Sequence, residues 1–248
     1  MSIAYIQSLE LAPLDPPDVQ VERFRGVGGE AAAAIDAGAI VAFGDGVPAQ
    51  AREDILYSLQ FAQRAASAAA DRYTAVQAWY EKYVNVLAAT GWVLTNFNPS
   101  KQQADRTEVE VAAAALEIVA AAAAAAGGVV SAVLPAAIKA LRGMAKDDGF
   151  ITLFEHYGAK GNIGNFQLSD VQQGAGGKLS IVTGAFQIRM AEQQNKFLFF
   201  TWREKGVSVW GDATTASFNQ ALYAELRETV RTRLGGEARK VIAEIPLA

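Results

Sequence analysis

The chain has 248 residues, and its 22 basic and 26 acidic side chains give a formal net charge of −4. Without a basic run, this balance excludes the electrostatic footprint of a nucleic-acid-binding protein. The sequence contains no cysteine, which excludes disulfides, thiolate metal sites and a cysteine nucleophile. A chain of this length can bury a substantial core, and we expect a single domain over residues 1–248.

The N-terminal residues 1–25 predict an extended arm. Three prolines lie between Pro13 and Pro17, and proline favours extended structure in itself and in the residue before it. The same stretch has no basic segment followed by a long apolar run, so we expect no Sec signal. We therefore expect a soluble protein made in a bacterial cytoplasm, and release by lysis, a dedicated machine or a partner stays open.

Residues 26–146 predict a helical part, which begins with a short helix over Glu30–Ile35. Its strongest signal is a seam at spacings of three and four over 55–87, which predicts one helix about 65 Å long from Ala49. A seam of this kind packs lengthwise on another helix, in the same chain or in a second one. The seam residues are Ile55, Leu59, Ala62, Ala66, Ala69, Tyr73, Val76, Tyr80, Tyr83 and Leu87.

The uncharged segment 118–138 organises the chain. It holds seven consecutive alanines, the pair Gly127 and Gly128, and Pro135. Its 21 residues could cross a bilayer if straight, but its seven Leu, Ile and Val residues gain only about 3 kcal/mol on insertion, which Gly, Pro and Ser erode. We expect two shorter helices or a hairpin, the second ending near Arg142, buried centrally behind the long helix.

Two interpretations of this segment stay open. It is either the central buried helix of an α+β domain or a masked apolar element that reaches lipid when it is released. In the second case Gly127 and Gly128 are the hinge. The predicted lipid-facing set is then Ile118, Val119, Val129, Val130, Val133, Leu134 and Ile138.

Residues 150–211 predict an antiparallel β-meander of about four strands. Apolar residues alternate or cluster there between turn-forming residues, at 165–168, 179–183, 186–190, 197–202 and 207–210. A C-terminal part, 212–248, follows. It predicts a helix from Thr214 to Leu234 and a tail that adds a short helix or an edge strand.

The residues that carry common enzyme chemistry are scarce. His156 is the sole histidine, so zinc sites of the usual kinds are excluded and a histidine-dependent triad would depend on this one residue. We interpret His156 as a packed residue at the end of an element or as a pH sensor. We expect no cofactor, no metal and no enzymatic activity. A carboxylate-pair enzyme stays open, and a polar pocket around Glu155 or Asp170 would favour it.

In the order of its elements the chain resembles two groups of proteins. The long helix from Ala49, the apolar segment 118–138 and the strands after Asn165 look like soluble bacterial α-helical pore-forming toxins and Evf-type virulence factors of insect guts. The first group implies a masked apolar segment beside long helices, and the second an α/β fold associated with membranes. Evf-type proteins are lipid-modified on a cysteine, an anchor that this sequence lacks.

We therefore expect an α+β fold in which long helices and a buried Ala-rich hairpin pack on a meander. The function that follows is a soluble, membrane-interacting bacterial toxin or virulence protein that exposes 118–138 to a target-cell membrane. Its partner is lipid, and self-association or a second toxin component stays open. The alternative is a non-enzymatic binding or assembly module that uses the helix 55–87.

Overall fold

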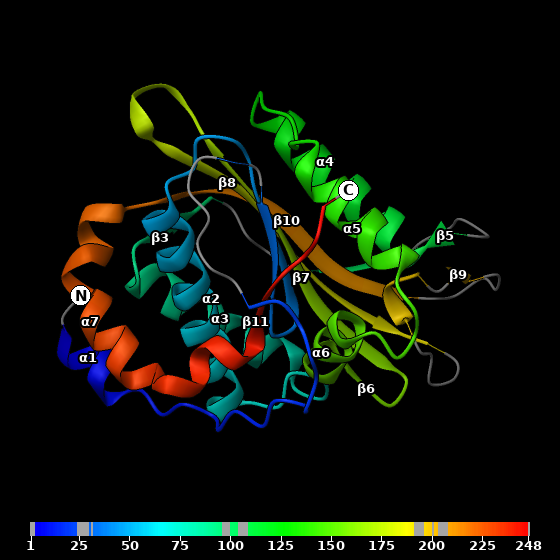
Figure 1. Cartoon of the computed structure of the whole chain (residues 1–248), viewed down its shortest axis with the longest axis horizontal. Coiled ribbons are helices and arrows are strands. Elements are labelled where there is room, and N and C mark those ends of the chain that lie inside the picture. Colours follow the sequence, from blue (N-terminus) through cyan, green and yellow to red (C-terminus); the bar gives the residue numbers. More distant parts are fainter. Residues whose placement is uncertain are drawn as a thin grey trace.

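The protein is built around a mixed sheet covered by helices on both faces (Figure 1). A computed structural model describes residues 3–23, 30, 32–95, 100–103, 109–190, 196–199, 201–202 and 208–247. The nine-stranded sheet has the order β11-β1-β2-β7-β8-β10-β3, with β4 also paired to β10 and β6 to β7, and β5 pairs with β9 separately. The strands are β1 (Ala32–Asp36), β2 (Ala39–Phe43), β3 (Trp92–Leu94), β4 (Ser100–Gln103), β5 (Val109–Glu110), β6 (Ala159–Lys160), β7 (Ile163–Gln173), β8 (Leu179–Arg189), β9 (Thr201–Trp202), β10 (Ser208–Phe218) and β11 (Ile242–Glu244).

The predicted meander is present as three long antiparallel strands, β7, β8 and β10. The prediction of about four strands, all antiparallel, is wrong, because the hairpin β1–β2 from the expected helical part joins the sheet with β2 parallel to β7. Residues 32–35 were expected to be helical and form β1 instead. All five residues of β1 are buried, and the covering of both faces outweighs the helix preference of alanine.

The predicted long helix is two helices, α2 (Ala49–Ala69) and α3 (Val76–Ala89), which pack on each other. The chain turns between them because Asp71 Oδ1 accepts hydrogen bonds from the backbone N–H groups of Tyr73 (2.8 Å) and Thr74 (2.9 Å). Most seam residues are buried inside this chain, so the seam is not a free surface for a second chain. The structure therefore contradicts the basis of the assembly-module alternative.

The central buried helix is α2, and the Ala-rich segment is not buried centrally. Fourteen of the 21 residues of α2 are buried, among them polar residues that have partners in the fold. Arg52 Nε donates to the Val47 carbonyl at 2.8 Å, and Trp92 Nε1 donates to Ser58 Oγ at 2.8 Å. Polar residues of α2 therefore lie in the interior, where other parts of the chain supply their partners.

The Ala-rich segment lies on the opposite face of the sheet from α2 and α3 (Figure 1). It forms α4 (Val111–Ala125) and α5 (Val133–Gly143), which confirms the expectation of two short helices. The helix α6 (Gly149–Gly158) occupies the start of the region predicted as sheet. Of the other helices, α1 (Ile3–Ser8) and α7 (Gln220–Leu234) lie on the α2 side.

Several element boundaries differ from the predictions. The two strands expected at 179–183 and 186–190 are the single strand β8. Instead of one strand at 197–202, the chain forms the 3₁₀ turn η2 (Phe197–Phe199) before β9. Strand β10 continues to Phe218, and Asn219 caps α7 by accepting from Leu222 N at 3.0 Å.

Both ends of the described chain join the fold. The expected arm contains α1, and an extended segment follows it. This segment is attached to α2 by a hydrogen bond from the Ala12 N–H group to the Arg64 carbonyl at 3.1 Å. The predicted C-terminal tail is confirmed, with the 3₁₀ turn η3 (Gly236–Val241) and the edge strand β11 beside β1. A further 3₁₀ turn, η1 (Ala175–Gly177), connects β7 and β8.

Candidate functional site

The α4–α5 hairpin follows from the spacing of its larger residues. Val111, Ala115, Val119 and Ala123 recur every four residues and face the sheet, while most of the other alanines of α4 are exposed or half-buried. The helix approaches β8 closely, because a Cβ built on Gly184 would lie 3.0 Å from Val119 Cγ2. Small residues therefore let α4 lie low on the sheet, and after Glu117 they leave an uncharged outer surface.

The structure divides the predicted lipid-facing set among three environments. Val119, Leu134 and Ile138 are buried against the sheet, Ile118, Val130 and Val133 are half-buried, and Val129 is 75% exposed. The seven side chains consequently do not form one continuous face. In the folded chain, Val129 is the member that solvent reaches most freely.

Gly127 and Gly128 end α4 in a Schellman turn. Gly127 has a φ of +75°, its N–H donates to the Ala124 carbonyl at 2.9 Å, and Gly128 N–H donates to the Ala123 carbonyl at 2.9 Å. This pattern satisfies carbonyl groups that the helix end would leave free, and glycine suits the left-handed residue. The pair predicted as a hinge therefore forms an ordered reversal between α4 and α5.

The connection between α4 and α5 is held down by a buried carboxylate on β7. Asp170 is fully buried and accepts hydrogen bonds from Ser131 N–H at 2.9 Å, from Ser131 Oγ, and from Gln172 Nε2 at 2.7 Å. Gln172 Nε2 also donates to the Val129 carbonyl at 2.7 Å. Because hydrogen bonds to a charged acceptor are stronger than neutral ones, Asp170 is the main polar fastening of this connection.

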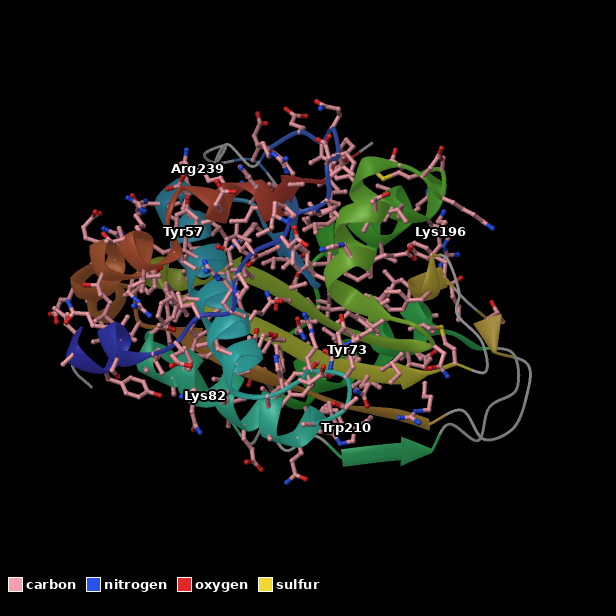
Figure 2. All side chains as sticks on the ribbon, turned by 90° about the horizontal axis from the view of Figure 1, so that it is seen from below. Tyr57, Tyr73, Lys82, Lys196, Trp210 and Arg239 are labelled. Atoms are coloured by element: carbon pink, nitrogen blue, oxygen red, sulfur yellow. The ribbon has the colours of Figure 1, made fainter. Side chains whose placement is uncertain are left out.

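The other end of the hairpin is fastened at the C-terminus of α5. Lys196 Nζ donates to the carbonyls of Arg142 (2.7 Å) and Met144 (2.8 Å), and Figure 2 shows Lys196 beside this hairpin. The Arg142 guanidinium also pairs with Glu110 at the start of α4. A cation at the last carbonyls of a helix is favourable, so these contacts fix where α5 ends.

Three connections gather at one end of the sheet and form what we call the loop end, residues 44–48, 126–132 and 174–178. Two of these connections are bonded to β7. The Gly44 N–H group of the first donates to the Val171 carbonyl at 2.8 Å, and the Val129 carbonyl of the second accepts from Gln172 Nε2. In Figure 1 the α4–α5 turn and the β7–β8 turn both project at the top. Asp45 and Lys178 are the charged residues among these positions.

The remaining sequence candidates lie apart from the loop end. His156 is exposed in the last turn of α6, and its ring stands edge-on to Tyr157 with 4.7 Å between centroids. Its role as a pH sensor stays a prediction. Glu155 accepts from Phe197 N–H at 2.9 Å while Asp170 holds Ser131, so these two carboxylates do not converge on a pocket. Whether the chain is an enzyme stays untested.

The described residues also lack two other kinds of site. Within them, no group of three or more acidic or histidine side chains is placed to hold a metal ion. Among the same residues, no helix has both the length and the apolar character needed to cross a membrane.

The sequence reasoning missed how Asp170 acts. Asp170 was considered only as a member of a carboxylate pair, yet its partners are Ser131 and Gln172. A carboxylate within an otherwise buried strand is a signal that it needs a partner, since a buried charge without one is costly. The identity of that partner depends on where the α4–α5 connection crosses β7, which the sequence does not show.

No protein-family model and no curated protein matches the sequence. Among solved structures, the chain is similar to the Evf virulence factor, with a TM-score of 0.43 and 13% identity over 95% of this chain and 91% of that one. It is also similar to a delta-endotoxin, with a TM-score of 0.46 and 10% identity over 84% of this chain and 90% of that one. These two structures agree with the resemblance stated from the order of the elements.

Proposed function

We propose that this chain interacts with membranes through its loop end. The observation that carries the proposal is the exposure of Val129, 75% of whose surface is free, in an uncharged turn between Ala120 and Ala136. An exposed valine in a turn that is otherwise made of small uncharged residues suits contact with an apolar partner. The toxin or virulence role that the order of elements predicts is part of this proposal.

Contact with the lipid interface suits the size of this surface. Complete burial of a valine side chain is worth about 1.5–3 kcal/mol, so Val129 contributes about 1–2 kcal/mol, and the neighbouring alanines add to this. Energies of this size favour reversible adsorption at the level of the lipid headgroups. Helix α4 has 15 residues and is about 22 Å long, shorter than a hydrocarbon core of about 30 Å.

Release of the whole hairpin is a larger step. It would expose five larger buried side chains, each worth about 2 kcal/mol, so the cost is about 10 kcal/mol. This cost is similar to the entire stability of an ordinary domain. Adsorption through the loop end therefore comes before any release of 118–138. Contacts with the membrane would have to supply the free energy that this release costs. The five side chains are Val111, Val119, Leu134, Ile138 and Leu141.

Two valine substitutions test the proposal. Val129→Glu places a charge in the centre of the proposed contact, and Val93→Glu is the matched control, because Val93 is 60% exposed on β3, three strands along the sheet from β7. Purified protein is mixed with phosphatidylcholine vesicles containing 30% phosphatidylglycerol, at pH 5 and pH 7.5. The bound fraction is measured by flotation, and dye release is measured in parallel.

We expect the wild-type chain and Val93→Glu to float with the vesicles, and Val129→Glu to bind at least tenfold more weakly. Dye release together with binding would extend the proposal from adsorption to disruption of the membrane. If the wild-type chain does not bind at either pH, or if both variants lose binding equally, the loop end is not a lipid contact. Unchanged circular dichroism of both variants establishes that the fold is intact.

A further inference from the structure

A second candidate site is a cavity of about 180 Å³ between α2, the C-terminal end of α7 and η3, on the face of the sheet opposite the Ala-rich hairpin. Its lining combines Arg231 and Arg239 with Tyr57, Gly235 and Gly236. The described residues that line it include no carboxylate. Since each molecule of liquid water occupies about 30 Å³, the cavity is large enough for one small polar ligand.

Tyr57 holds two guanidinium groups at this cavity. The Arg231 guanidinium lies over the face of the Tyr57 ring, 5.7 Å from its centroid. Arg239 Nε donates to the Tyr57 hydroxyl at 2.9 Å, and Figure 2 shows Arg239 beside Tyr57. One cation therefore lies over the ring face and the other at the ring edge. They come from α7 and η3 and approach the cavity from different directions.

A single carboxylate, that of Glu53, lies close to both arginines. Glu53 Oε2 is 2.9 Å from Arg231 Nη2, whereas its Oε1 is 3.6 Å from Arg239 Nη2. Glu53 therefore balances one of the two positive charges, and its planar carboxylate forms a hydrogen bond with only one of the two guanidinium groups. The second charge remains at the cavity and attracts an anion.

The other charges near the two arginines change this balance little. Glu228 is 3.6 Å from Arg231 Nη1, but its side chain is 84% exposed, and an exposed ion pair contributes little. Glu237 pairs with Lys240 at 2.6 Å, so these two charges compensate each other. An anion in the cavity would therefore meet an excess of positive charge.

Both arginines keep donors that a ligand can reach. Arg231 Nε is buried, but Nη1 is accessible, and Glu228 at 3.6 Å is too far from it for a hydrogen bond. Within the described residues, Arg239 donates a side-chain hydrogen bond only through Nε, and 69% of its side chain is exposed. Gly235 and Gly236 are exposed, and a Cβ built on either would meet no atom within 4 Å. These glycines leave the space beside the arginines open.

From this arrangement we propose that the cavity binds the phosphate group of a phosphomonoester. Such a group carries about two negative charges at pH 7.5, and its three terminal oxygens point in different directions. It can therefore accept from one guanidinium over the ring face and from another at the ring edge. A planar carboxylate matches one guanidinium fork. The site is separate from the loop end, and the inference does not depend on the proposed membrane contact.

Two simple anions test the site by isothermal titration calorimetry at pH 7.5 and constant ionic strength. Inorganic phosphate should bind at one site per chain. Acetate should bind about tenfold more weakly, because it loses one charge-assisted contact. Equal binding of phosphate and acetate would overturn the choice of a phosphate group. Absence of phosphate binding at 50 mM would overturn the site itself.

Three variants locate the binding. Arg239→Gln removes an exposed guanidinium and should weaken phosphate binding about tenfold. Glu53→Gln removes the carboxylate that competes for both arginines and should tighten phosphate binding. Arg189→Gln is the control, because Arg189 is exposed at the end of β8, four strands along the sheet from β11.

The opposite signs separate a binding site from general attraction by surface charge. Unchanged binding in Arg239→Gln, an equal loss in Arg189→Gln, or weaker binding in Glu53→Gln would contradict the assignment. Unchanged circular dichroism establishes that each variant keeps the fold.

Two further probes distinguish a soluble ligand from a lipid headgroup: glycerol 3-phosphate, and phosphatidylcholine vesicles that contain phosphatidic acid. Flotation uses the Val129→Glu chain, so that the proposed loop-end contact does not contribute. Flotation that Arg239→Gln abolishes assigns the phosphate to a lipid headgroup, whereas binding of glycerol 3-phosphate without flotation assigns it to a soluble phosphomonoester. Binding of inorganic phosphate but of neither probe would mean an adventitious ion only, and would overturn the proposal.

Discussion

Replacing Asp170 with asparagine tests the fastening of the α4–α5 connection. The carboxylate is fully buried and accepts three hydrogen bonds, two from Ser131 and one from Gln172. Asparagine has the same shape but only one acceptor oxygen, and its amide N–H₂ group must face at least one of these donors. The substitution therefore removes the charge from these bonds, and the Ser131 hydroxyl has to change from donor to acceptor where it meets the new amide N–H₂ group.

The expected loss in the free energy of unfolding is about 2–3 kcal/mol. Each hydrogen bond to a charged group contributes about 1.5–3 kcal/mol. The full sum is not lost, because Ser131 and Gln172 are half-buried and can turn to water. Urea denaturation measures the global change, and hydrogen exchange at the Ser131 amide measures the local one. A local loss of 2 kcal/mol corresponds to about thirtyfold faster exchange.

Gln172→Ala is the control for Asp170→Asn. It removes the two Gln172 bonds but leaves both Ser131 bonds to Asp170, so we expect a loss of about 1–2 kcal/mol and a Ser131 amide that stays protected. If Asp170→Asn unfolds at the same urea concentration as the wild-type chain and Ser131 exchange is unchanged, the carboxylate does not hold the connection. The description of the loop end as a fastened structure would then be wrong.

Four other substitutions probe features of the fold. Gly127→Ala places a Cβ on a residue with a φ of +75° and should cost about 1 kcal/mol in urea denaturation, and no loss would contradict the Schellman assignment. Arg227→Met removes the bidentate partner (2.8 and 2.7 Å) of the Asp54 carboxylate, whose side chain is 2% exposed, and should cost about 2–4 kcal/mol. Lys160→Met removes an exposed ion pair and should change the free energy of unfolding by less than about 0.5 kcal/mol. Equal losses in Arg227→Met and Lys160→Met would refute the argument from burial. Burial raises the pKa of Asp36, so the folded chain keeps a proton that the unfolded chain releases above about pH 4. The free energy of unfolding of the wild-type chain should then fall by about 1.4 kcal/mol per pH unit from about pH 4 up to the folded-state pKa of Asp36. Asp36→Asn should lack this pH dependence, which urea denaturation from pH 4 to pH 7 measures. Parallel pH profiles would show that burial does not raise the pKa of Asp36.

Local signals predicted the elements whose conformation depends on near neighbours. The alanines and Gly127 with Gly128 predicted two short helices, and the structure has α4, an αL turn and α5. Alternating apolar residues predicted strand conformation within β7 and, as two separate strands, within β8, and the tail predicted β11. The turn at Asp71 also had a local cause, an Asp side chain that accepts from the N–H groups two and three residues later, and the helical seam concealed it.

Burial, in contrast, depended on which elements met. Residues 32–35 are mostly alanine and favour helix when taken alone, but they form β1 because both of their faces are covered. Helix α2 has a polar face by sequence and is the most buried helix, since partners such as Arg227 for Asp54 come from far along the chain. The Ala-rich segment has no charge and nevertheless lies at the surface, because its small side chains have little apolar area to bury.

The sequence by itself therefore determined the mixed helical and strand character, the short apolar hairpin and the absence of cysteine chemistry. Only the tertiary structure decided that Val129 is exposed while Val119 is buried, that Asp170 fastens Ser131, and that Arg231 and Arg239 line one cavity. The physical reason is the range of the interactions. Helix ends and turns are fixed by hydrogen bonds between residues a few positions apart, whereas burial and the pairing of polar groups join residues from distant parts of the chain.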